Sequence, residues 1–189
     1  MKLIAQYAED IFEIAYNLKE GKFNLKDLTS AIEKKALEKA EDKINKTKGD
    51  LFEIFAYMFF NAFRNDPSVG LVEYTPIDIE EDYGVDGTGV NANKQKVAVQ
   101  IKYRRNPKDL VLYSEIARTF TSGRLNLKLD LEYKNSIYVF TNANGVTPTC
   151  EKVFGNIVKA LNNNGIDHYI RNNYNFWKFF YEKVKRNLS

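Results

Sequence analysis

Residues 84 to 102 hold the side chains with the clearest potential for chemistry. Val97 to Ile101 is a short, apolar, β-branched run that predicts a buried strand, yet the run ends in Gln100 and Lys102. Because side chains alternate along a strand, Gln100 and Lys102 share one face. A lysine on a buried face is costly unless an anion lies opposite, and Asp86 is only a hairpin's reach away. We therefore expect a carboxylate, an amide and an ammonium to converge, a combination suited to metal-assisted chemistry on a phosphate.

A second element upstream carries another candidate carboxylate. The order of Asp86, Gln100 and Lys102 resembles the PD-(D/E)xK nuclease superfamily, and within it the Mrr-type restriction endonuclease branch, in which glutamine replaces the middle acidic ligand. The resemblance extends to Glu53, which follows Gly49 in an apolar helix and corresponds to the carboxylate on the first core helix of that family. A carboxylate within such a helix is expected to seek a cation.

Two positions depart from the family pattern. Val85 stands before Asp86 where the family often has proline, and Gln100 is neutral where a carboxylate is usual. Both departures are common in the Mrr-like branch, and both bear on the metal affinity of the site. Gly84 and Gly87 do not match a nucleotide-binding loop, because no helix follows them, and we expect them to allow a sharp bend beside Asp86.

The resemblance implies a fold and a mechanism. The expected fold is α/β, with a restriction-endonuclease-like core (a mixed central sheet flanked by helices) over residues 49–189 and an N-terminal helical hairpin appendage over residues 1–48. The expected activity is Mg²⁺-dependent hydrolysis of DNA phosphodiester bonds, with Mn²⁺ able to substitute. Asp86, Glu53 and the backbone carbonyl of Ile101 would hold the metal, Gln100 would hold a ligand or water through its amide oxygen, and Lys102 would contact the phosphate and the attacking water.

Three functions stay open at this point. The first is a restriction-type or phage-type DNA endonuclease, the second is a structure-selective nuclease such as a Holliday-junction resolvase, and the third is a catalytically inactive nuclease-like DNA-binding module. Cutting both strands of a duplex requires two active sites or two sequential events. We therefore expect a homodimer, with the N-terminal hairpin as the candidate interface.

The charge balance locates the expected DNA contacts. The chain of 189 residues has 28 basic and 25 acidic residues, a net charge of only +3, so a nucleic-acid surface must come from local clustering. Such a cluster follows Lys102 directly, with Arg104, Arg105 and Lys108, and Arg118 lies farther on. Phosphate contacts from these residues would position a duplex over the metal. A solvated basic loop is the alternative.

Several other classes of protein are disfavoured. Cys150 and His168 are the only cysteine and the only histidine, so a disulfide, a cysteine-based zinc cluster and a Ser-His-Asp triad lack the residues they need. Charge appears too early for a signal peptide, and no apolar run approaches the length of a membrane span. We expect a cytoplasmic protein with no membrane partner and no small-molecule cofactor.

Periodicity predicts the elements that position the site. Helices are expected over residues 4–18, 24–46, 50–64, 114–121 and 148–162, and a last amphipathic helix contains Phe176 and Phe180. Strands are expected over residues 71–79, 85–90, 96–103, 125–133, 137–141 and 166–170. The acidic residues Asp78, Glu80, Glu81 and Asp82 are expected to form a solvated loop, with Asp82 as a spare metal ligand.

Overall fold

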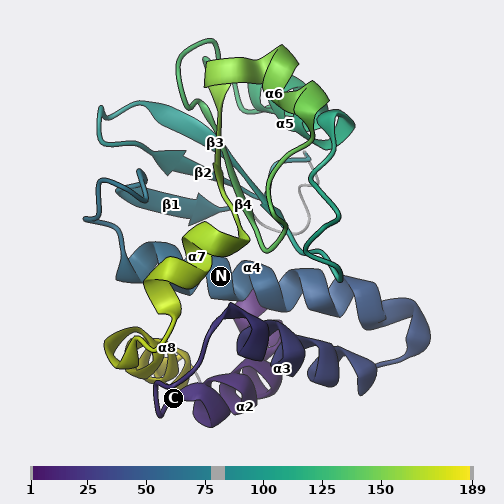
Figure 1. The fold of residues 1–189 in the computed structure, drawn as a ribbon, viewed down its shortest axis with the longest axis vertical. Helices are drawn as coiled ribbons and strands as arrows, with labels where there is room; N and C mark the ends of the chain where they lie inside the picture. The colour runs from purple at the N-terminus through teal and green to yellow at the C-terminus, as the bar shows by residue number, and fades with distance from the viewer. Residues whose placement is uncertain (1, 78–83, 188–189) are drawn as a thin grey trace. The chain divides into compact units, whose positions relative to one another are not determined.

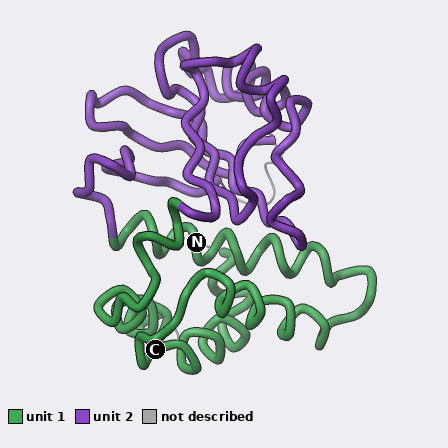
Figure 2. The backbone as a smooth tube through the Cα atoms, viewed as in Figure 1, with its two compact units in different colours: residues 1–62, 165–189 green, residues 63–164 purple. Residues whose placement is uncertain are grey.

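The chain divides into two compact units. The computed structural model describes residues 2–77 and 84–187. Residues 1–62 and 165–189 form unit 1, and residues 63–164 form unit 2 (Figure 2). The boundary predicted between residues 48 and 49 falls inside helix α4 (Ile44–Ala62), and the C-terminal segment belongs with the N-terminal one.

Unit 1 is helical. Its elements are α1 (Lys2–Gln6), α2 (Ala8–Leu18), α3 (Leu25–Leu37), η1 (Glu41–Lys43), α4, most of α7 (Asn163–Ile170) and α8 (Tyr174–Arg186). The predicted helix over 4–18 is interrupted at Tyr7, and the predicted helix over 24–46 ends at Leu37. None of the helices in the described part of the chain is long and apolar enough to cross a membrane.

Aromatic side chains of α4 and α8 form the centre of unit 1. Phe55 packs edge-on against Phe176 and Phe180, with ring centroids 5.9 and 6.1 Å apart. The N-terminal helices belong to the same core: the Tyr7 hydroxyl donates a 2.8 Å hydrogen bond to Asp50 of α4. Because residues 1–48 share their core with α4 and α8, deleting them would expose much of the apolar surface of unit 1.

Unit 2 is built on a five-stranded mixed sheet with strand order β1-β2-β3-β4-β5 (Figure 1). The strands are β1 (Glu73–Pro76), β2 (Gly87–Val90), β3 (Lys96–Lys102), β4 (Ile137–Thr141) and β5 (Val158–Leu161). The first three form an antiparallel meander, and β3, β4 and β5 run parallel. The α/β class and the mixed sheet flanked by helices are therefore confirmed.

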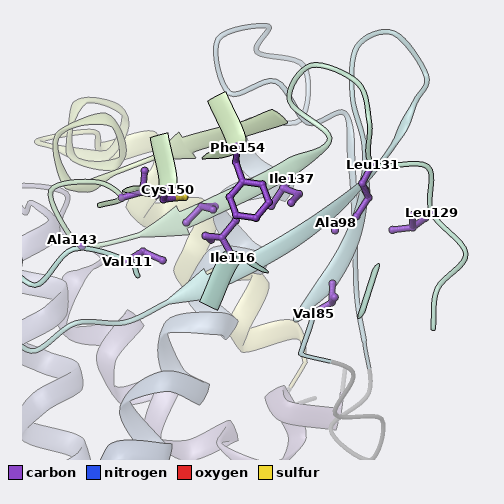
Figure 3. Packing of buried hydrophobic residues seen from close by; sticks show 12 residues of the cluster. Val85, Ala98, Val111, Ile116, Leu129, Leu131, Ile137, Ala143, Cys150 and Phe154 are labelled. Atoms are coloured by element: carbon purple, nitrogen blue, oxygen red, sulfur yellow. The ribbon is translucent and has the colours of Figure 1, made fainter. Parts of the chain in front are cut away.

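Two helices cover one face of this sheet. Ile116 of α5 (Tyr113–Leu125) and Phe154 of α6 (Pro148–Phe154) pack in one apolar cluster with Ala98 of β3 and Ile137 of β4 (Figure 3). Ala98 shares its strand face with Gln100 and Lys102 because side chains alternate. The polar end of β3 therefore continues the face on which α5 lies.

The strand predicted over residues 125–133 is wrong. Its first residue ends α5, and the chain then folds back on that helix, with the Leu129 N–H donating to the Gly123 carbonyl at 3.0 Å. Lys128 has a φ of 54°, which is incompatible with an extended strand. Leu129 and Leu131 are nevertheless buried in the apolar cluster. The alternation indicated the burial of these two leucines correctly, but not that of Leu125, which is exposed, and not the secondary structure.

Two predictions near the C-terminus are also wrong. The helix predicted over residues 148–162 ends at Phe154, because Gly155 takes a φ of 44°, and after the turn η2 (Gly155–Ile157) the chain enters β5. The strand predicted over residues 166–170 is part of α7. Ile166 and Ile170 are both buried, and their four-residue spacing places them on one side of a helix.

Candidate functional site

The backbone of Asp86 is fixed within the sheet. Its N–H donates to the Val99 carbonyl at 3.0 Å, and its carbonyl accepts from the Ile77 N–H at 3.1 Å. The next residue must be glycine, because a Cβ on Gly87 would lie 2.4 Å from the Tyr74 ring. Gly84 has a φ of 68° and supplies the bend expected before Asp86.

The Asp86 carboxylate meets the end of β3. Its Oδ2 accepts a short hydrogen bond from the Gln100 side-chain amide and a 2.6 Å hydrogen bond from the Ile101 N–H. The Gln100 Oε1 in turn accepts from the Thr119 hydroxyl of α5 at 2.5 Å. Gln100 is 2% exposed and Thr119 is 0% exposed. The result is a buried polar chain that runs from α5 through β3 to Asp86.

These hydrogen bonds determine the orientation of the Gln100 side-chain amide. If the amide were reversed, its oxygen would face the Asp86 carboxylate, and two acceptors would oppose each other without a proton. The Gln100 oxygen therefore faces Thr119 and the nitrogen faces Asp86. The expectation that the amide oxygen holds a metal-bound water does not match this orientation, and Gln100 acts instead as a clamp on Asp86.

Lys102 lies on the same face of β3 as Gln100, as predicted. The chain is held there by the Thr141 hydroxyl, which donates to the Lys102 carbonyl at 2.7 Å. Within residues 2–77 and 84–187 the Lys102 ammonium forms no hydrogen bond and no ion pair. Its charge is consequently uncommitted and only partly buried.

A carboxylate that the sequence analysis did not single out lies near Lys102. Glu115, in the first turn of α5, forms an ion pair with Arg104 and accepts from the Leu112 N–H at 2.9 Å. Burial alone would raise the pKa of Glu115, but the Leu112 N–H and the positive charges of Arg104 and Lys102 together hold the pKa below its usual value. Glu115 and Thr119 are four residues apart on one helix, so helical spacing is the signal that links them.

The oxygen donors of the site bear on whether it suits Mg²⁺. Among the described residues, no group of three or more acidic, histidine or cysteine side chains could hold a metal ion. Asp86 places a carboxylate at the end of β3, and its Oδ2 already accepts two N–H groups. Mg²⁺ commonly binds through one or two carboxylates and keeps several waters beside substrate phosphates. The residues present therefore fit an ion that takes most of its ligands from water and substrate.

The other predicted ligands are Glu53 and the backbone carbonyl of Ile101. Glu53 belongs to unit 1, on the partly buried stripe of α4 that also contains Gly49 and Tyr57, whereas Asp86, Ile101 and their neighbours belong to unit 2. The participation of Glu53, and that of the Ile101 carbonyl, stays a prediction. The acidic residues at 78, 80, 81 and 82 lie outside the described residues.

The four residues predicted to contact DNA differ in whether their side chains are exposed at the surface. Arg104 is committed to Glu115, and its backbone is clamped by Asn142, which accepts from the Arg104 N–H at 2.6 Å. Arg105 and Lys108 are exposed in the loop after β3. Arg118 is exposed on α5 and lies against Gly84, where a Cβ would meet the Arg118 Nε at 2.6 Å. Three basic side chains therefore remain at the surface around this end of β3.

Comparisons of the chain with protein-family models, with curated proteins and with solved structures found no significant match. The resemblance to the PD-(D/E)xK nucleases therefore stays a prediction carried by the residues themselves.

Proposed function

We propose that this protein is an endonuclease that hydrolyses DNA phosphodiester bonds with Mg²⁺, of the restriction or phage type. One observation carries the proposal: the Asp86 carboxylate is held in place by Gln100 and the Ile101 N–H, and the uncommitted Lys102 ammonium lies farther along the same strand face. An anchored carboxylate and an unpaired ammonium supply a cation ligand and a phosphate contact.

The residues divide the work. Asp86 would hold the metal, with Glu53 as the second predicted ligand; a bound Mg²⁺ supplies stabilisation of negative charge on the phosphate. Gln100 and Thr119 keep the Asp86 carboxylate in one orientation. Lys102 donates to a non-bridging phosphate oxygen and orients the attacking water, and Arg105 and Lys108 contact flanking phosphates. By resemblance, the expected product ends are a 5′-phosphate and a 3′-hydroxyl.

A substrate panel tests this proposal. Purified protein is incubated with supercoiled plasmid, linear duplex, a four-way DNA junction and RNA, each with Mg²⁺, Mn²⁺ or EDTA. We expect cleavage of duplex DNA that EDTA stops and that Asp86→Asn abolishes, since an amide lacks the ligand charge. Lys152→Ala, a change at an exposed position of α6, serves as the control and should cleave normally. Cleavage confined to the junction would identify a resolvase-like enzyme instead.

A second candidate function is a DNA-binding module without catalysis. The observation that favours it is the closed hydrogen bonding at Asp86, where two N–H groups occupy the carboxylate oxygen that faces β3. This candidate predicts no cleavage of any substrate with either metal, together with DNA binding that Arg105→Ala weakens in a mobility-shift assay. The homodimer remains a proposal for either function, and sedimentation velocity tests it directly.

A further inference from the structure

A polar pocket lies at the end of the sheet of unit 2 that is opposite Asp86. It has a volume of about 470 Å³, within the range of small-molecule sites. Gln95, just before β3, lines it together with Tyr138 and Lys159, which are the second residues of β4 and β5. Because β3, β4 and β5 are parallel, these residues mark their amino ends, whereas Asp86 meets the carboxyl end of β3. Gln95 and Ile101 are six residue steps apart along the chain, which corresponds to roughly 20 Å in an extended strand.

Lys159 brings an unpaired positive charge into this pocket. Its ammonium donates to the Ser68 carbonyl at 2.8 Å and lies 5.8 Å from the centre of the Tyr138 ring. In the part of the chain that the structure describes, this ammonium forms no ion pair. Burial lowers the pKa of Lys159, and the more distant Asp66 only partly opposes that effect. A half-buried cation with one neutral partner favours an anion beside it.

Neutral donors surround the same space. Gln95 uses its Oε1 to accept from Asn91 at 3.1 Å, which leaves its amide nitrogen available. Across residues 2–77 and 84–187, the side chains of Lys134 and Asn135 at the pocket form no hydrogen bond. Among the described residues, no acidic side chain lines the pocket. A site with several donors, two ammonium groups and no carboxylate is suited to an oxyanion.

Gly70 keeps the lysine in this position. It has a φ of 84°, and a Cβ there would lie 2.4 Å from the Lys159 Nζ. The ammonium therefore rests against bare backbone that any other residue would cover. The positive φ favours glycine at this position, and a side chain there would displace the flexible end of Lys159.

We propose that this pocket binds the phosphate group of a nucleotide or of a nucleic-acid end. Lys159 is the charged ligand, and Gln95, Asn135 and Lys134 supply further N–H donors. The site is independent of the nuclease proposal, because Asp86, Gln100 and Lys102 are not among the residues that line the pocket.

Isothermal titration calorimetry at low salt tests the proposal with four probes: inorganic phosphate, adenosine monophosphate, a 5′-phosphorylated oligonucleotide and its unphosphorylated twin. We expect the protein to bind inorganic phosphate, adenosine monophosphate and the 5′-phosphorylated oligonucleotide more tightly than the unphosphorylated oligonucleotide. Lys159→Met should weaken this binding at least tenfold, since methionine removes the charge but keeps an apolar side chain of similar length. Lys152→Met, at an exposed position outside the pocket, is the matched control and should bind as the original protein does. Stronger binding of the mononucleotide than of the phosphorylated oligonucleotide identifies a free nucleotide as the ligand, and the reverse order identifies a nucleic-acid end.

Two further variants make the test sharp. Gly70→Ala retains every charge but occupies the space against which the ammonium rests, so it should also weaken binding, while circular dichroism reports whether it is folded. Asp86→Asn should bind phosphate normally. The proposal is overturned if no phosphate probe binds at millimolar concentration, if Lys159→Met binds like the original protein, or if Asp86→Asn loses phosphate binding to the same extent as Lys159→Met.

Discussion

Replacing Gln100 with glutamate is the most direct test of the geometry at Asp86. The Gln100 amide donates to the Asp86 Oδ2 and is 2% exposed. Glutamate has nearly the same shape, so packing is preserved while the donor becomes a carboxylate. The two acceptors can share this contact only if one of them takes up a proton.

The free energy needed to keep one carboxyl group protonated determines how strongly Gln100→Glu destabilises the folded protein. With a reference pKa of about 4.3 for glutamate, keeping one carboxyl protonated costs about 1 kcal/mol at pH 5 and about 3.7 kcal/mol at pH 7, at roughly 1.36 kcal/mol per pH unit. The folded protein binds a proton that the unfolded chain has released, so the pKa is raised by folding. The free energy of unfolding therefore falls as pH rises above about 4.3, until the folded-state pKa is reached.

Urea denaturation of the original protein and of Gln100→Glu at pH 5, 6 and 7 in EDTA measures this difference. We expect the destabilisation to grow by about 2.7 kcal/mol from pH 5 to pH 7. Gln6→Glu, at an exposed position of α1, is the control and should change stability by less than about 0.5 kcal/mol at each pH. A destabilisation that stays constant across this range would refute the contact between Asp86 and residue 100. If the site also holds a metal, Mn²⁺ should restore more stability to Gln100→Glu than to the original protein.

Three other changes test neighbouring parts of the site. Thr119→Val removes the hydroxyl that donates to the buried Gln100 Oε1 and should lower the free energy of unfolding by about 1–3 kcal/mol in urea denaturation; an unchanged midpoint would contradict the hydrogen bond. Lys102→Ala should lower the DNA cleavage rate by about two orders of magnitude, roughly the effect of losing one transition-state donor, while calorimetry shows metal binding unchanged. Because the pKa of Glu115 is lowered in the folded protein, its contribution to stability is present above the unfolded pKa and is lost as pH falls through the folded pKa. The acid denaturation of Glu115→Gln should accordingly be less steep, and identical acid transitions would argue against the Arg104 partnership.

The parts of the Asp86 site that depend on residues close to one another in the sequence could be predicted. The apolar, β-branched run from Val97 to Ile101 predicted β3 to within one residue, and the alternation of side chains along a strand predicted that Gln100 and Lys102 share one face. Asp86 and Gln100 are joined by a short hairpin between β2 and β3, so a pairing between neighbouring strands brings them together. The buried run over residues 137–141 was likewise predicted with its observed bounds.

The parts that were not predicted depend on packing between distant segments. Thr119 reaches Gln100 only because α5 lies on the face of β3 that carries Ala98, and no local pattern states which face a helix will cover. Val158 to Leu161 became a strand because it pairs with β4, although its residues also suit a helix. Tertiary pairing outweighs the weak local preference of such short segments.

Because the side chain at position 100 is neutral, the residues around Asp86 can fold into place without a bound metal ion. Two carboxylates at this contact would need a cation or a proton before the chain could fold stably around them. Here the negative charge of Asp86 is met by the N–H groups of Gln100 and Ile101, so the site is satisfied by the chain alone. The free energy of a bound cation is then not needed to organise the site, and its affinity depends on the ligands that water and a substrate phosphate provide. It follows that Mg²⁺ alone should hardly raise the melting temperature of this protein, whereas Mg²⁺ together with a bound DNA phosphate should raise it.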